Sequence, residues 1–284
     1  MKEFKDKVAV ITGAASGIGR GLAERCVKEG MKVVLADVEE SSLKETEKAL
    51  KTRGADVLAV KTDVSKFKDI EALAQKTLAK FGAVHLLFNN AGVQTGVQRS
   101  KALWENTLAD WEWVIGVNLW GVIYGVKVFV PIMLQQKTEC HIVNSASIAA
   151  LMSIGELGIY RVTKSGILIF SETLYLQLKK LNSLIGVTVF LPAFVRSRLN
   201  DAERNRPKEL KNPPEPPPTP EEQAILKTFE EGNRNAMPPE KFAELVFQAI
   251  EEGKLYVFSH PEYNAMLKQR MENMLQGDNP ASKY

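Results

Sequence analysis

The sequence predicts an α/β fold in which a doubly wound parallel sheet of about seven strands carries helices on both faces. Short runs rich in Val, Ile and Leu recur along the 284 residues, and amphipathic helical patterns lie between them. These runs are nearly continuously apolar, as are strands that are buried on both faces. Strands and helices that alternate along a chain form parallel βαβ units. Strands are expected within residues 7–13, 32–37, 56–64, 83–92, 140–147, 186–192 and 254–259.

A glycine-rich turn follows the first strand. "VAVITGAASGIG" places Gly13, Gly17 and Gly19 between the strand and a helix that begins near Ile18. Glycines at such places allow a tight turn, a close approach of the backbone to a pyrophosphate and tight packing of the helix on the sheet. The helix N-terminus also attracts phosphate. A purely structural turn is the alternative, but the order strand, turn, helix favours a dinucleotide site.

The second strand ends at Asp37, 18 residues after Gly19. An acidic residue at the end of the second strand is well placed to bind the ribose of an adenosine. Amphipathic patterns over residues 42–53 and 66–81 then predict the helices that follow the second and third strands.

The longest apolar stretch, Trp113 to Val126, is 14 residues long, contains Asn118 and is followed by Lys127. It is shorter than the ~18 to 20 residues of a membrane span, so a buried helix is expected. Because this helix is apolar around most of its circumference, one side should face the core and the other a second partner, such as another subunit.

The stretch "GIYRVTKSG" places Tyr160 four residues before Lys164, at the start of a helical pattern. Positions i and i+4 share one face of a helix. The same spacing recurs at Tyr175 and Lys179, so the spacing alone does not identify a site.

Residues 198–238 contain the segment "RPKELKNPPEPPPTPEE", which has too many prolines for a helix or a strand. Two interpretations remain open: a solvated insertion or a lid over a binding site.

Composition excludes several classes of function. The 37 basic and 34 acidic residues are interspersed and give a formal charge of +3, so no basic stripe is available to nucleic acid or to an anionic membrane. Two cysteines and three histidines lie scattered along the chain, which argues against a disulfide scaffold, a metal site and a histidine-based triad. The N-terminal apolar run is too short for a signal peptide, and a cytoplasmic protein is expected.

Together, five elements resemble the single-domain branch of the short-chain dehydrogenase/reductase family. They are "TGAASGIG" at 12–19, "NNAG" at 89–92, Asn118, Ser147 and the pair Tyr160 and Lys164, in family order. The resemblance covers roughly residues 5–200 and implies a single Rossmann-type domain over residues 1–284. It also implies hydride transfer between a nicotinamide cofactor and an alcohol or ketone.

The implied catalytic residues are Asn118, Ser147, Tyr160 and Lys164. Such a reaction needs an acid/base near neutral pH, and free tyrosine has a pKa of about 10. A positive charge on Lys164 about 4 Å away could lower this pKa by about three units. Ser147, or Ser145 as an alternative donor, would hold the substrate oxygen.

By the same resemblance, Lys164 hydrogen-bonds the nicotinamide ribose. Asn118 holds a water that relays the proton; a helix-to-backbone hydrogen bond is the alternative role for this amide. Tyr175 lies ~22 Å further along the same predicted helix and is interpreted as a packing or subunit-contact residue.

NAD is the expected cofactor. Asp37 would accept hydrogen bonds from a ribose 2'-hydroxyl and repel a 2'-phosphate. Ala193 and Ser197 depart from the family's usual Gly and Thr. The implied cofactor-binding residues are Gly13, Ser16, Gly17, Ile18, Gly19, Asp37, Asp63, Val64, Asn90, Ala91, Gly92, Tyr160, Lys164, Pro192, Val195 and Ser197.

The substrate is expected to be a small neutral apolar secondary alcohol or ketone, because the implied walls carry no fixed charge. Core packing is the alternative role for these wall residues. The expected walls are Val93, Gln94, Ala149, Met152, Leu157 and Phe194, with Ser147 and Tyr160 at the reacting oxygen.

Two other functions remain open. One is a dinucleotide-sensing or scaffold protein without catalysis, and the other is a dehydratase or epimerase on the same fold. A homo-oligomer is expected, because the helices at Trp113–Val126 and after Tyr160 carry apolar residues on more than one face, and the family resemblance implies a homotetramer.

Overall fold

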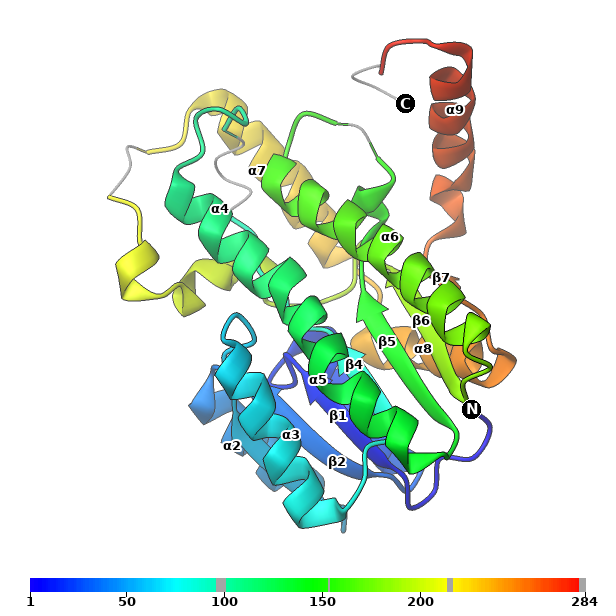
Figure 1. The fold of residues 1–284 in the computed structure, drawn as a ribbon. Helices are drawn as coiled ribbons and strands as arrows, with labels where there is room; N and C mark the ends of the chain where they lie inside the picture. Colours follow the sequence, from blue (N-terminus) through cyan, green and yellow to red (C-terminus); the bar gives the residue numbers. More distant parts are fainter. Residues whose placement is uncertain (96–100, 153, 214–216, 281–284) are drawn as a thin grey trace.

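The computed structural model describes residues 1–95, 101–152, 154–213 and 217–280. Over these residues it is built on a parallel sheet with the strand order β3-β2-β1-β4-β5-β6-β7 (Figure 1). The predicted doubly wound fold and all seven strand positions are confirmed. The strands are β1 Val8–Thr12, β2 Lys32–Asp37, β3 Val57–Lys61, β4 Leu86–Asn89, β5 Cys140–Ser145, β6 Ile185–Leu191 and β7 Tyr256–Phe258.

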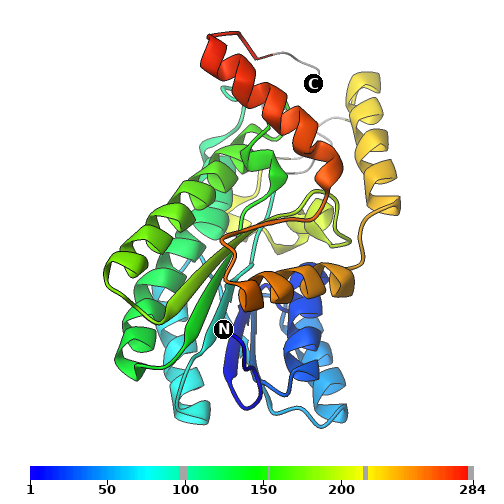
Figure 2. The same ribbon diagram turned by 90° about the vertical axis from the view of Figure 1, so that its right-hand side faces the viewer.

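Helices cover both faces of the sheet, and Figure 2 shows α6 and α8 on opposite sides of it. Leu22, Leu43 and Phe247 pack with Ile11 on the face of α1, α2 and α8. Leu73 and Phe129 belong to the core on the other face, under α3, α5 and α6. The helices are α1 Gly17–Lys28, α2 Glu40–Thr52, α3 Phe67–Phe81, α4 Leu108–Ile115, α5 Gly121–Gln136, α6 Gly158–Lys180, α7 Pro220–Arg234, α8 Pro239–Glu252 and α9 Asn264–Gln276.

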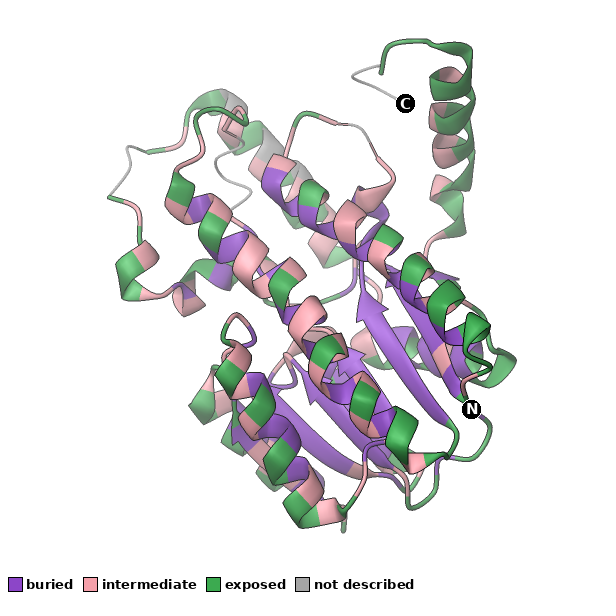
Figure 3. Ribbon diagram, viewed as in Figure 1, coloured by how far each residue is buried: buried purple, intermediate pink, exposed green. Residues whose placement is uncertain are grey.

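The strand order reverses between β1 and β4. From β1 the chain winds outward to β3, and it then returns to place β4 beside β1, with Ile11 opposite Phe88. At such a reversal the loops leave the carboxyl ends of the two strands in opposite directions and open a crevice. The central strands β1, β4 and β5 are buried along their length (Figure 3), so polar residues that follow these strand ends gather at this crevice.

The apolar helix expected at Trp113–Val126 is longer than predicted. It runs from Leu108 to Gln136 as α4, the π-helical turn η1 (Gly116–Trp120) and α5. The estimate of 14 residues was too short because it ended the helix at Lys127, which in fact lies within α5. By length and composition this is the one helix of the described residues that could span a membrane, but Phe129 and Met133 pack into the core against the sheet.

The proline-rich segment is partly helical, which corrects the prediction that it forms neither helix nor strand. After the 3₁₀ helix η3 (Leu199–Asn205) comes a second short turn, η4 (Lys208–Leu210). Helix α7 then begins at Pro220, where a capping box between Thr219 and Glu222 satisfies its first amides. Proline is compatible with this first helical position because its missing N–H would have no intrahelical partner.

A buried ion pair fixes the base of this segment to α4. Arg206 forms an ion pair with Asp110, with 2.8 Å between Nη2 and Oδ1, and the two side chains are 1% and 3% exposed. Asn212 donates to the same carboxylate at 2.8 Å, and Thr107 donates to the side chain of Asn212. The start of α4 and residues 206–212 are therefore held together.

Candidate active site

A cavity of about 520 Å³ opens at the carboxyl ends of the central strands. Every residue expected at the cofactor lines it, and so does Ser147. These residues are Gly13, Ser16, Gly17, Ile18, Gly19, Asp37, Asp63, Val64, Asn90, Ala91, Gly92, Ser147, Tyr160, Lys164, Pro192, Val195 and Ser197. The structure therefore brings together residues that the sequence spreads over nearly 190 positions.

The glycine-rich turn needs its glycines. Gly13 and Gly17 have φ of 67° and 53°, a region that disfavours side chains. A Cβ on Gly17 would lie 2.8 Å from the Cβ of Ser197, and one on Gly19 would collide with the carbonyl oxygen of Gly13. The first amides of α1 have no partner within the helix, and Ser16 makes no side-chain cap. This cradle fits a pyrophosphate.

Asp37, which lines the same cavity as the glycine-rich turn, is held in a fixed orientation. One carboxylate oxygen accepts from the amide of Ala15 at 2.9 Å and the other from the amide of Glu39 at 3.0 Å. Burial raises the pKa of Asp37, and these two hydrogen bonds oppose that shift. The carboxylate is thus positioned to accept hydrogen bonds from a ribose.

Thr12, which the sequence reasoning did not assign, positions the "NNAG" loop. Its hydroxyl donates to the carbonyl of Phe88 at 3.1 Å and accepts from the amides of Asn90 and Ala91 at 2.9 and 3.1 Å. A threonine that ends a buried strand directly before the first glycine is the signal that could have identified it.

Tyr160 and Lys164 lie side by side at the start of α6. The Lys164 Nζ atom is 5.4 Å from the centre of the Tyr160 ring and donates to the carbonyl of Ser145 at 2.7 Å. Ser147 begins the turn after β5, where its hydroxyl accepts from the amide of Ala149 and donates to the carbonyl of Pro192. The end of β5 and the start of α6 thus face one another, as the sequence predicts.

The pKa of Tyr160 differs from the expected direction. Burial raises it to about 12, and a hydrogen bond with Ser147 acts in the opposite direction. Burial also lowers the pKa of Lys164 to about 7. In the protein alone, desolvation outweighs the hydrogen bond with Ser147 and the nearby charge of Arg161, so the tyrosine is held as a neutral acid.

Asn118 lies in the π-helical turn and does not itself line the cavity in the described structure. Its amide donates to the carbonyl of Val93 at 2.9 Å and to Thr163 at 3.2 Å, and its oxygen accepts from the amide of Val93 at 2.8 Å. Both ends of the amide are therefore engaged, and they tie the loop after β4 to α6. π-helical turns are frequent at functional sites.

The expected substrate walls are only partly assembled. Val93 lines the cavity, whereas Gln94, Ala149, Met152, Leu157 and Phe194 do not line it in the described part of the chain. Gln94 donates to Asn200 at 2.7 Å, and the carbonyl of Met152 accepts from Arg161 at 3.0 Å. The Phe194 ring contacts Phe229 of α7, with 6.1 Å between the ring centres. These residues support the surrounding segments.

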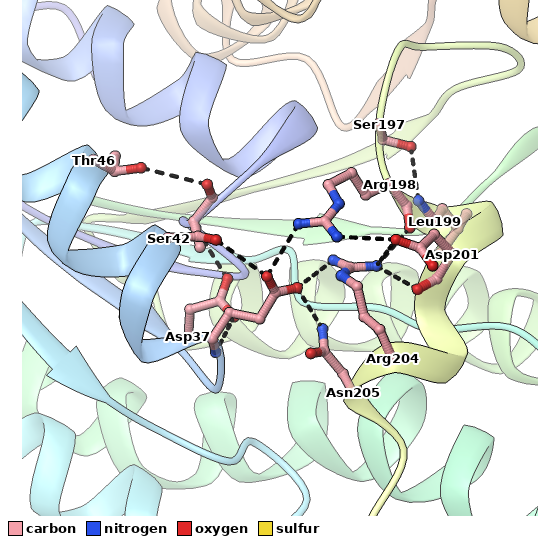
Figure 4. A network of polar contacts seen from close by, with 11 residues as sticks. Asp37, Ser42, Thr46, Ser197, Arg198, Leu199, Asp201, Arg204 and Asn205 are labelled. Carbon is pink, nitrogen blue, oxygen red and sulfur yellow. Dashed lines mark hydrogen bonds and ion pairs between the residues drawn. The ribbon is translucent and has the colours of Figure 1, made fainter.

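Other lining residues come from α4 and from the segment after β6, and the sequence reasoning missed them. They are Trp111, Trp113, Arg198, Leu199, Arg204 and Asn205. Figure 4 shows the two arginines reaching toward the turn after β2, next to Asp37. The signal for Arg204 and Asn205 was the cluster "ERNRPK" at 203–208, soon after the segment that borders the nicotinamide in the family pattern.

Tyr175 occupies a different environment from Tyr160. It is partly buried in the core under α3 and α5, and the Lys179 Nζ atom lies 5.9 Å from its ring centre. It does not line the cavity in the described structure. Its interpretation as a packing residue agrees with this position.

Comparison with known proteins gives consistent matches. The model of the short chain dehydrogenase family matches residues 7–208. A CLA biosynthesis dehydrogenase/reductase from Lactiplantibacillus plantarum is 35% identical over 278 residues, which cover 97% of this chain and 95% of that protein. A diacetyl reductase [(S)-acetoin forming] from Staphylococcus epidermidis is 35% identical over 195 residues, 69% of this chain and 74% of that protein.

A solved structure extends the likeness to the whole chain. The short chain dehydrogenase/reductase from Burkholderia phymatum, solved in complex with NAD, superposes with a TM-score of 0.94 at 44% identity and covers 100% of this chain and 99% of that one. The family match spans more than half of the sequence and includes the glycine-rich turn, Ser147, Tyr160 and Lys164. The chain therefore belongs to the short-chain dehydrogenase/reductase family.

Proposed function

We propose that this protein is an NAD-dependent oxidoreductase that interconverts an apolar secondary alcohol and its ketone, with Tyr160 as the acid/base. One observation carries the proposal: the glycine-rich turn, Asp37, Ser147, Tyr160 and Lys164 all line one cavity. A cofactor site and a proton donor that share a cavity are what hydride transfer to a carbonyl requires.

NAD is supported over NADP by Asp37, whose fixed carboxylate would repel a 2'-phosphate. The Burkholderia phymatum relative is in complex with NAD. We place the pyrophosphate at the first amides of α1, in a turn whose close packing leaves no room for a side chain on Gly17 or Gly19. Bound in its oxidised form, NAD would accept the hydride and bring a positive charge that favours the phenolate of Tyr160.

The proton chemistry follows from the burial of Tyr160. A tyrosine whose pKa is raised to about 12 carries its proton at neutral pH, so that it has a proton to give to a ketone oxygen. Ser147 would hold that oxygen beside the phenol. Lys164 would hold the ribose and, when protonated, stabilise the phenolate left on Tyr160. Asn118, engaged at both ends by Val93 and Thr163, would hold the loop after β4 against α6 beside this pair.

A neutral apolar substrate is supported by the side chains around the cavity. Val93, Trp111 and Trp113 line it beside one acidic residue of α4, Glu112, and the nearby Arg206 is neutralised by Asp110. We assign residues 198–238 to a cover of the substrate side within a single domain, because Phe229 of α7 contacts Phe194 after β6. Gln94, Met152 and Phe194 would contact the substrate if this cover closed further.

A panel of secondary alcohols and ketones with NAD(H) tests the proposal. Net change in the absorbance of the reduced nicotinamide with one or more members is the expected result. Tight NADH binding without turnover of any member would favour a sensing or scaffold role. Conversion of substrate with no net cofactor change would favour a dehydratase or epimerase.

We also propose a cytoplasmic homotetramer. Exposed apolar side chains on η1, α5 and α6 form a surface suited to another subunit: Trp120, Leu134, Val162, Ile169 and Leu176. Helix α9 has no buried residue and projects from the body (Figure 2), so a neighbouring subunit could cover it. Both cysteines of the chain are free thiols, in keeping with a reducing compartment.

A further inference from the structure

Glu39 connects two distant segments beside the cavity. It lies two residues after Asp37, at the start of α2. Its carboxylate binds Arg198 at 3.2 Å, Asn205 at 2.7 Å and Arg204, all from the segment around η3 (Figure 4). We call this set of contacts the Glu39 bridge.

The bridge spans the adenosine end of the cavity. Asp37 and Val38, directly before Glu39, line one wall. Arg198, Arg204 and Asn205 line the opposite wall. Since Glu39 joins the two walls by side chains alone, the separation of the walls depends on these contacts.

The bridge is more than a surface ion pair. The Glu39 side chain is 13% exposed and that of Arg204 is 21% exposed. Burial alone would raise the pKa of Glu39, but hydrogen bonds from Asn205 and Arg204 outweigh burial and lower this pKa. Arg198 is 47% exposed and contributes less, because solvent screens exposed pairs.

Arg204 is also fixed from its own side and keeps one donor unused. It donates to the carbonyls of Arg198 and Asp201 at 2.9 and 2.6 Å. Its Nε atom is buried and has no hydrogen-bond partner in the described structure. A buried donor without a partner is costly.

We propose that Glu39 is a positioning residue for the cofactor: through Arg204, Arg198 and Asn205 it holds residues 198–205 across the adenosine end of the cavity, and bound dinucleotide leaves only after this bridge opens. The inference rests on the cofactor of the proposed function. It assigns Glu39 a role distinct from that of Asp37, which would bind the ribose directly.

The rate of NADH release, measured by stopped-flow fluorescence, tests the bridge. Glu39→Gln should release NADH about fivefold faster or more, as expected when a partly buried ion pair is lost. Glu40→Gln is the matched control, because Glu40 is the neighbouring exposed glutamate and pairs with Lys44 and Lys61 at 2.8 and 3.6 Å. It should release NADH at the unmutated rate.

Salt provides a second measurement that needs no variant. Ionic strength screens a partly exposed bridge, so release from the unmutated protein should accelerate with KCl, whereas release from Glu39→Gln should depend much less on it. A fold defect would not produce this difference in salt dependence.

A double-mutant cycle with Arg204→Gln completes the test. If both side chains act through one bridge, the double variant should release NADH no faster than the faster single variant. NADH that leaves Glu39→Gln at the unmutated rate, or leaves Glu40→Gln equally fast, would overturn this inference alone. An unmutated protein that binds no NADH would overturn the proposed function as well.

Discussion

The Nζ atom of Lys164 lies 5.4 Å from the centre of the Tyr160 ring, with both side chains buried. Because water is excluded from both groups, each is stabilised in its uncharged form. The pKa of the lysine falls to about 7 and that of the tyrosine rises to about 12. The pair therefore has a measurable signature in the pH dependence of stability.

Between pH 7 and 9 the free energy of unfolding should rise with pH. The folded pKa of Lys164, about 7, lies below its ordinary value of 10.5. In this pH window the unfolded chain therefore binds more protons than the folded protein, and raising the pH favours the folded state. Tyr160 works against stability only above its ordinary pKa of 10. Lys164→Met should remove up to about 2 kcal/mol of this rise.

Urea unfolding of the protein without cofactor at several pH values measures this effect. Lys179→Met is the control, because Lys179 is an exposed residue of the same helix. If the free energy of unfolding depended on pH in the same way for Lys164→Met and the unmutated protein, burial would not lower the pKa of Lys164.

Asp37 should determine the choice of cofactor. Asp37→Ala is expected to reduce the preference for NADH over NADPH by about tenfold or more, because a buried like-charge contact with the 2'-phosphate costs several kcal/mol. Titration by nicotinamide fluorescence measures both affinities. Asp56→Ala, an exposed acid paired with Lys80, should leave the preference unchanged, and equal affinities of the unmutated protein for both cofactors would contradict the assignment.

The buried pair of Asp110 and Arg206 should be important for stability. Asp110→Asn leaves a guanidinium that is 1% exposed without its charged partner, and breaking a buried pair on one side costs about 3 to 5 kcal/mol. Asp201→Asn also removes an arginine contact, but Asp201 is 62% exposed and its loss should cost less than about 1 kcal/mol. Equal denaturation midpoints for the two variants would be incompatible with this difference.

Local patterns predicted the parts of the site that depend on short-range geometry. The spacing of Gly13, Gly17 and Gly19 and the place of Asp37 at the end of the second strand follow from how a strand, a turn and a helix succeed one another. Tyr160 and Lys164 share a helix face because of the helical repeat. The seven strands were predicted from apolar runs, since a parallel sheet buries both faces.

Other features depend on long-range packing and could not be read from the sequence. Glu39 and Arg198 are 159 residues apart, and only the folded chain places them together. The direction of the Tyr160 pKa is decided by burial, whereas the spacing to Lys164 indicated only a nearby charge. The helix Leu108–Gln136 was underestimated, because Lys127 was taken as its end although the apolar residues Val128–Leu134 continue it.

The exposed apolar residues of α6 should mediate assembly. Ile169 and Leu176 are 61% and 63% exposed, so replacing both by Glu should leave the subunit folded while dissociating the tetramer. Light scattering at micromolar concentration measures the mass. Lys76→Glu on α3 is the control, because no large hydrophobic side chain of that helix is exposed. A monomeric unmutated protein would contradict the proposed assembly.

The two tyrosines of α6 provide the most direct test of the site. Tyr160→Phe removes only a hydroxyl, so NADH affinity should change little while kcat falls by the ~10²- to 10⁴-fold that positioned proton transfer contributes. Tyr175→Phe makes the same chemical change beside Lys179, outside the cavity as described, and kcat should stay within a few fold. Since both residues have a lysine four positions later, only their surroundings differ. An active Tyr160→Phe together with an inactive Tyr175→Phe would show that the chemistry lies elsewhere on the helix.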